Sequence, residues 1–141
     1  ALFPFVLKSK DLIVFLKIVL FVLLLISFSC FIFYLYAQEV LLLVFNLADE
    51  EIIAVYNVFL ITVVVSFMTQ AFGYPLFSIV DNVQCANKTS YYSLFFYISG
   101  ALLLFYFNRI TPMNIAVLAL VNELFLFCLR FVFFIVVKKQ R

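Results

Sequence analysis

Two side chains of opposite charge, Glu123 and Arg130, lie seven residues apart in a long apolar stretch near the end of the chain. If that stretch is a helix, both project from one face, about 10 Å apart along the axis. If it also crosses a membrane, an unpaired charge at this depth costs about 2.5–3.5 kcal/mol, so Glu123 must be protonated, paired or in contact with water. Two turns are too long for a simple intrahelical ion pair. Glu123 and its neighbour Asn122 are therefore candidates for an ion or substrate pathway.

Two cations inside apolar stretches, Arg130 and Lys17, each have two interpretations. Each side chain could extend toward the membrane surface, burying its methylenes and keeping its charge in water. Each could instead offer a cation to a phosphate group in a cavity. Extension to the surface is favoured for Lys17, which lies about one to two turns into its stretch. Both remain candidates for the substrate pathway.

A set of small and polar residues recurs at helical spacing in the second apolar stretch. Its members are Thr62, Ser66, Thr69, Gln70 and Gly73. This spacing places them on one helical face. Such a face either hydrogen-bonds to a packed neighbouring helix or lines an aqueous cavity. Gln70 is accordingly a further candidate for the pathway.

Gly73 and Pro75 come late in the same stretch and are candidates for a hinge. Proline removes one backbone hydrogen bond and clashes one turn back, so a kink is expected here. The kink could belong to a moving part or be a static bend. In the third stretch, Gly100 is expected to allow close packing of two helices.

The elements that position these residues are long apolar helices. Hydrophobic residues make up 69% of the 141 residues and charged residues 11%, more apolar surface than a water-soluble core can bury. The sequence predicts an all-α membrane protein with four spans, because a spanning helix needs about 20 apolar residues. The predicted spans are residues 12–36, 52–80, 91–107 and 113–137.

Polar residues at the boundaries support these spans. The expected helix starts are an N-cap at Ser9, one at Asp49, one at Thr89 or Ser90, and Pro112 at the first position of the last helix. Residues 38–47 are apolar but too short to span, which predicts a short interfacial helix or a re-entrant turn.

The distribution of Lys and Arg predicts the orientation. Basic residues precede the first span and follow the last, and the 38–51 segment has none. Lys88 lies in the 81–90 loop and Arg109 in the 108–112 loop. The positive-inside rule then places both chain ends and the 81–90 loop in the cytoplasm.

The composition argues against several function classes. The chain has no histidine, three widely separated cysteines and two glycines. Histidine catalysis, metal-binding spacings and glycine-rich phosphate loops are therefore missing from the sequence. We expect no enzyme activity, no cofactor, no metal site and no nucleic-acid partner.

Four segments, in their order and spacing, carry a resemblance to a known family. They are Leu2-Phe3-Pro4 with Lys8 and Lys10, Ala37-Gln38-Glu39-Val40 through Phe45, Gly73-Tyr74-Pro75-Leu76, and Leu120-Val121-Asn122-Glu123-Leu124 with Arg130. The chain resembles the C-terminal part of bacterial polysaccharide flippases of the O-antigen type, within the multidrug/oligosaccharidyl-lipid/polysaccharide exporter superfamily. Residues 1–141 would then form one transmembrane domain, a C-terminal piece of a two-lobed transporter of about twelve helices.

The resemblance implies a function in polysaccharide biosynthesis. Members of the family move a polyprenyl-diphosphate-linked oligosaccharide across the bacterial inner membrane by alternating access, as multipass proteins with a cytoplasmic C-terminus. Membrane lipids and a coupling ion, H⁺ or Na⁺, would be further partners. Two other functions stay open: another exporter of the same superfamily, carrying a drug or a cell-wall lipid precursor, and a noncatalytic membrane scaffold subunit.

Overall fold

The computed structural model describes residues 11–46, 49–79 and 81–139, with side chains as far as Val137. Apart from the turns that join the helices, this part of the chain is helical, without a strand. The helices are α2 (Leu12–Leu35), α3 (Ala37–Phe45), α4 (Glu50–Ala71), α5 (Tyr74–Ile79), α6 (Val83–Tyr106) and α7 (Pro112–Lys139). The expectation of an all-α fold is confirmed.

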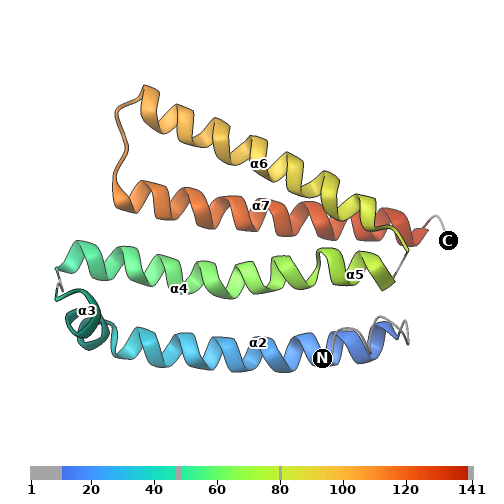
Figure 1. Ribbon diagram of the computed structural model, residues 1–141, viewed down its shortest axis with the longest axis horizontal. Helices are drawn as coiled ribbons and strands as arrows, with labels where there is room; N and C mark the ends of the chain where they lie inside the picture. The colour runs from blue at the N-terminus through green and yellow to red at the C-terminus, as the bar shows by residue number, and fades with distance from the viewer. Residues whose placement is uncertain (1–10, 47–48, 80, 140–141) are drawn as a thin grey trace.

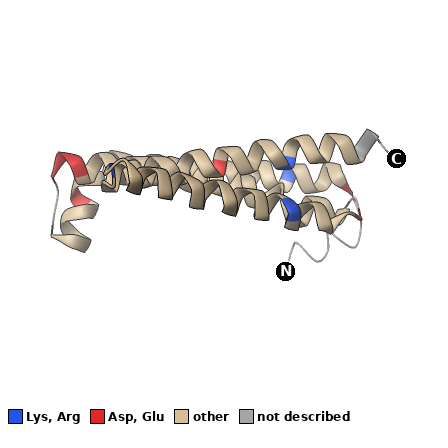
Figure 2. Cartoon of the chain, turned by 90° about the horizontal axis from the view of Figure 1, so that it is seen from above, with Lys and Arg blue, Asp and Glu red and all other residues tan. Residues whose placement is uncertain are grey.

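The long helices lie side by side in the order α6, α7, α4, α2 (Figure 1), and the packed pairs are α6 with α7, α7 with α4, and α4 with α2. Figure 2 shows the same array edge-on as a thin layer. Helices α4 and α7 run in the same direction, whereas α2 and α6 run in the opposite one (Figure 1). The short helix α3 lies across the end of the array where α4 begins, so a short helix does occupy the predicted 38–47 segment.

Most of the large apolar side chains point away from the protein. Phe21 and Phe28 on α2 are 63% and 64% exposed, and Phe95 on α6 is 75% exposed. Three helical segments are long and apolar enough to cross a membrane: Leu12–Leu35, Glu50–Ile79 and Pro112–Val137. These properties are those of a membrane protein, because lipid is the solvent in which such side chains are stable.

Helix α6 differs from the prediction at its start. It begins at Val83 rather than at 91, because Asn87, Lys88, Thr89 and Ser90 continue the helix instead of forming a loop. The predicted cap at Thr89 or Ser90 is therefore wrong: both hydroxyls lie within α6 and donate to the Ala86 carbonyl, at 2.8 and 3.0 Å. These polar residues lower the hydropathy of the first half of α6, which is not among the three candidate spans.

The other helix starts follow local rules. Asp11 caps α2, and its Oδ1 accepts hydrogen bonds from the N–H groups of Ile13 and Val14 at 2.9 and 3.2 Å. The expected cap at Ser9 lies outside the described residues. Asp49 occupies the N-cap position of α4 without a side-chain cap bond. Pro112 is the first residue of α7, as predicted.

The predicted kink near Gly73 and Pro75 is present as a break between α4 and α5. The Gly73 N–H donates to the Gln70 carbonyl at 3.0 Å, three residues back, so the last turn of α4 is tightened. Pro75 has no N–H to continue the helical pattern. The break leaves the Thr69 carbonyl without its usual partner, the N–H four residues on.

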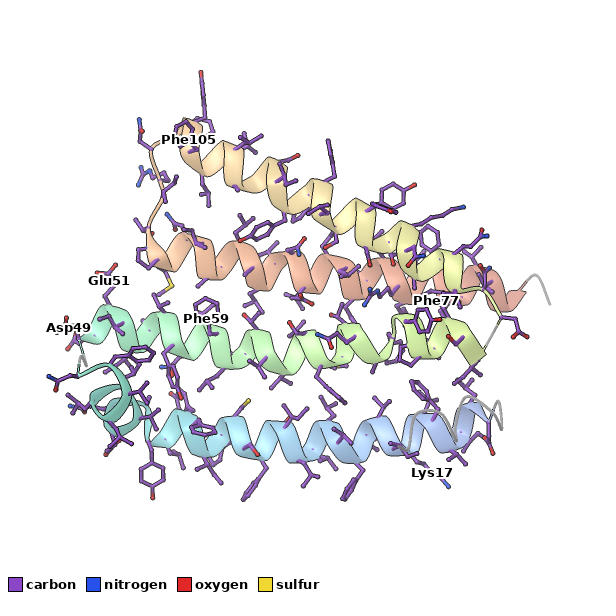
Figure 3. All side chains as sticks on the ribbon, in the orientation of Figure 1. Lys17, Asp49, Glu51, Phe59, Phe77 and Phe105 are labelled. Carbon is purple, nitrogen blue, oxygen red and sulfur yellow. The ribbon has the colours of Figure 1, made fainter. Side chains whose placement is uncertain are left out.

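The buried side chains gather around α5. One cluster joins α2 to α4 and α5, through Phe15, Val19, Ala71, Leu76 and Ile79; a second joins α5 to α6 and α7, through Phe77, Cys85, Ala86 and Val137. Phe77 is fully buried and is labelled in Figure 3. Further along the contact between α6 and α7, a Cβ on Gly100 would come within 2.5 Å of Leu118 Cδ1. The missing side chain of Gly100 therefore permits close packing of the two helices, as expected.

Candidate functional site

Arg130 on α7 points into the array rather than toward the membrane surface. Its side chain is only 8% exposed. Nη1 donates to the Thr69 carbonyl, Nη2 donates to Ser90 Oγ at 3.1 Å, and Nε faces Thr89 Oγ1 at 3.5 Å. The guanidinium therefore connects α7 to both α4 and α6. Of its two interpretations, extension to the surface is wrong.

Gly73 provides the space for this guanidinium. A Cβ at Gly73 would lie 2.7 Å from Arg130 Nη1 and 2.8 Å from Cζ, so a side chain here would displace the guanidinium from its bonds. The carbonyl that accepts from Nη1 belongs to Thr69, and it is available because the Gly73 N–H bonds to Gln70 instead. The helix break thus supplies both the space and the acceptor for Arg130.

A cavity of about 420 Å³ borders the guanidinium. Its lining residues are Phe67, Gln70, Ala71, Tyr74, Pro75 and Arg130. A guanidinium has five N–H donors, and the three bonds above use one each from Nε, Nη1 and Nη2. The remaining donors on Nη1 and Nη2 are available to an anion that enters this cavity. Gln70, an exposed residue, lies on its wall, so the structure brings Gln70 and Arg130 together.

Glu123 and Asn122 line a different cavity, of about 400 Å³, between α4, α6 and α7. Glu123 is partly buried, and its backbone carbonyl accepts from Thr69 Oγ1 at 3.2 Å. Asn122 Oδ1 accepts from Ser93 Oγ at 2.9 Å. No ion pair joins Glu123 to Arg130, both of which are among the described side chains, so the two charges serve separate cavities.

The sequence left two interpretations of the polar face of α4, hydrogen bonding to a packed helix and lining a cavity. Different residues of the face show each of them. Thr69 is 1% exposed and bonds to the backbone of α7, as expected of contact between packed helices. Thr62 lies on the wall of the cavity that contains Glu123. The face therefore contributes to helix packing at one end and to a cavity further along.

Lys17 is not brought into either cavity. It is exposed on α2, and Figure 3 shows its side chain pointing away from the other helices. Helix α2 packs against α4 and α3, and α4 separates it from α7 (Figure 1). Of its two interpretations, the structure favours extension toward the surface.

Three residues of α6 belong to the site and were not predicted: Thr89, Ser90 and Ser93. Thr89 is fully buried and Ser93 is 5% exposed. Their spacing of four places Thr89 and Ser93 on the same helical face, a signal that was available in the sequence. It was missed because the polar run around Lys88 resembles a loop.

The part of the chain described here contains no group of three or more acidic or cysteine side chains that could hold a metal ion. Comparisons with protein-family models, with curated proteins and with solved structures find no match to this chain.

Proposed function

We propose that this chain is part of a flippase that moves a polyprenyl-diphosphate-linked oligosaccharide across the bacterial cytoplasmic membrane. The observation that carries the proposal is Arg130: a buried cation with unused N–H donors beside a cavity. A diphosphate is an anion whose oxygens match the forked geometry of a guanidinium. The oligosaccharide would follow the polar wall that includes Gln70, and the isoprenoid chain would remain among the exposed apolar side chains.

The cost of burying a charge supports a functional role for Arg130. An ionisable side chain within a membrane-spanning helix is expensive and is usually retained for transport or for pairing. Here the cation has hydrogen-bond acceptors but no carboxylate within ion-pair distance, among the described residues. An anionic cargo would neutralise it.

The helix break gives a physical basis for alternating access. Broken helices in transporters place free backbone groups and hinges near the binding site. In this chain the break between α4 and α5 lies directly against Arg130. Binding of an anion to the remaining N–H donors would pull the guanidinium toward the cavity, and because Nη1 also holds the Thr69 carbonyl, this would alter the contact between α4 and α7.

The direction of the helices supports four crossings with both chain ends in the cytoplasm. Helices α4 and α7 are neighbours that run in the same direction (Figure 1). The chain between them consists of α5 and then α6, so α6 must return across the layer. Helix α6 has 24 residues, about 36 Å of helix, which is long enough to span. The orientation follows from the Lys and Arg residues, because acidic residues contribute little to it.

Reporter fusions test this topology. A phosphatase that is active only outside the cytoplasm should be inactive when fused after Asp81 and active when fused after Asn108, since α6 would lie between the two points. A fusion after Lys139 should again be inactive. Equal activity at Asp81 and Asn108 would show that α6 does not cross.

An export assay tests the transport function. In the intact transporter in its host, Arg130→Ala and Glu123→Gln should each strongly reduce surface polysaccharide per molecule of transporter in the membrane, because each removes the charge that borders a cavity. Lys17→Ala is the matched control and should export normally, since Lys17 is exposed on the far side of α2. Normal export by both variants would refute the assignment of these sites.

A further inference from the structure

A groove separates α2 from α4 in the half of the layer where α4 begins. In the other half, Phe15 and Val19 on α2 form a buried cluster with Ala71 on α4. The structure describes all of α2, and none of its residues after Val19 is buried. At the far end, α3 packs against α4 with Leu41 buried. Between these two contacts lies a volume of about 450 Å³, here called the α2–α4 groove, with apolar walls formed by Leu25, Ile26, Phe33, Leu60 and Val63.

The polar groups of the α2–α4 groove lie at one depth. Tyr56 is six residues after the start of α4, and Ser29 is six residues before the end of α2, so each lies about 9 Å from its helix end. The two helices run in opposite directions, which brings these ends together (Figure 1). The span that α4 and α5 form has 30 residues, about 45 Å, which matches a bilayer with its headgroups around about 30 Å of hydrocarbon. Tyr56 and Ser29 therefore lie just inside the hydrocarbon boundary, at the level of the ester groups of phospholipids.

The hydrogen-bonding capacity at this level suits an ester carbonyl. Ser29 Oγ has donated its proton to the Leu25 carbonyl at 2.9 Å and can only accept a further bond. The Tyr56 hydroxyl makes no hydrogen bond with any described residue and can donate one into the groove. Below this level the walls are apolar, as an acyl chain requires. One wall thus offers a donor at the ester level and hydrocarbon contacts beneath it.

The charge at the mouth of the groove indicates which headgroup fits. Glu39 on α3 and Asp49, Glu50 and Glu51 at the start of α4 lie at this end, and the 38–51 segment contains no Lys or Arg. Figure 2 shows these acidic residues together, and Figure 3 shows Asp49 beside α3. Arg109 follows α6, which α7 and α4 separate from α2 (Figure 1). Complementary charge therefore favours a headgroup with an ammonium and disfavours an anionic one.

We propose that the α2–α4 groove binds one phospholipid with an ethanolamine headgroup. One acyl chain lies in the groove, its ester carbonyl accepts from the Tyr56 hydroxyl, and its ammonium lies beside Glu39 and Asp49. The lipid fills the space between α2 and α4 that no side chain of α2 occupies. This site does not depend on the proposed flippase function, and it can be measured without any cargo.

The test is native mass spectrometry of the intact purified protein, titrated in detergent with dioleoyl phosphatidylethanolamine or dioleoyl phosphatidylglycerol. These lipids have the same acyl chains, so a difference between them reports the headgroup. We expect one saturable phosphatidylethanolamine adduct and weaker binding of phosphatidylglycerol. The double variant Glu39→Gln with Asp49→Asn should lose this preference. Asp49 makes no side-chain cap bond, so its replacement leaves the start of α4 intact.

Three variants locate the acyl chain. Val63→Phe fills the groove and should abolish the saturable adduct. Tyr56→Phe removes only the hydroxyl and should weaken binding about 2- to 10-fold, the value of one hydrogen bond. Leu102→Phe is the matched control: it adds similar bulk at a side chain on α6 that is 63% exposed, away from the groove, and should bind lipid normally.

Several outcomes would overturn the lipid site. Equal binding of the two lipids by the unmodified protein would reject the headgroup assignment. An adduct that persists unchanged in both Val63→Phe and Tyr56→Phe would place the lipid elsewhere. Displacement of the adduct by an equimolar polyprenyl diphosphate would assign the groove to the tail of the cargo instead. Each of these results leaves the export assay of Arg130 and Glu123 as a separate test of the transport proposal.

Discussion

Replacing Arg130 by alanine is expected to destabilise the packing of α7 against α4 and α6 by about 2–4 kcal/mol, because three hydrogen bonds of a charged group disappear and the Thr69 carbonyl loses its partner. The cost of placing the charge in the membrane changes this loss of stability little. The helices stay in the membrane when they separate, so the charge is in the membrane in both the packed and the separated state. The measurement is unfolding of the purified protein in mixed detergent micelles, followed by circular dichroism.

The charge and the geometry of Arg130 are separable in this experiment. Arg130→Lys keeps the charge, but an ammonium on a single nitrogen cannot reach the three acceptors that the planar guanidinium connects. We expect it to recover only part of the stability. Lys17→Met removes an exposed cation on α2 and should leave unfolding unchanged. Equal stability of Arg130→Ala and the unmodified protein would show that the guanidinium contacts do not hold the helices together.

The second large effect is expected at Gly73, and its size should depend on Arg130. In the unmodified protein, Gly73→Ala introduces a Cβ 2.7 Å from Nη1 and should destabilise by about 1–3 kcal/mol, as overpacking does. In the Arg130→Ala background the guanidinium is absent. The same substitution should then cost far less, because the remaining close contact is with the Gln70 carbonyl at 3.1 Å. Alanine also has the better helix propensity.

A double-mutant cycle measures this coupling directly. The four proteins are the unmodified chain, the two single variants and the double variant, each unfolded under the same conditions. Residues in contact give interaction energies that differ from zero, whereas independent sites are additive. Strict additivity would mean that Gly73 is required for the backbone of the break and not for the space that Arg130 occupies.

The two effects together bear on transport. Arg130, Gly73 and Thr69 form one unit in which a helix break, a small residue and a buried cation depend on each other. A variant that loses export but unfolds normally would place its residue in the cargo or ion pathway. A variant that loses both, as expected of Arg130→Ala, removes a residue that also holds the helices together. Glu123→Gln is expected to belong to the first group, since the bond that Glu123 accepts from Thr69 uses its backbone carbonyl and not its carboxylate.

Much of the fold is predictable from the sequence because it depends on local physics. Apolar runs of sufficient length become helices in lipid, Asp49 and Pro112 stand where α4 and α7 begin, and the missing N–H of Pro75 marks the break after α4. The start of α6 was mispredicted for the same reason: the polar residues around Lys88 end the apolar run, and hydropathy alone cannot distinguish a polar helical turn from a loop.

The candidate site was predictable only in part. The chain by itself determined which residues are out of place in lipid, since the cost of a charge or a polar group there depends on its type and depth, as for Glu123 and Arg130. Only the tertiary structure decided where these side chains point. The partners of Arg130 lie 61, 41 and 40 residues away, at Thr69, Thr89 and Ser90. No local rule selects such partners, because they become neighbours only when α4 and α7 pack in parallel and α6 closes against them.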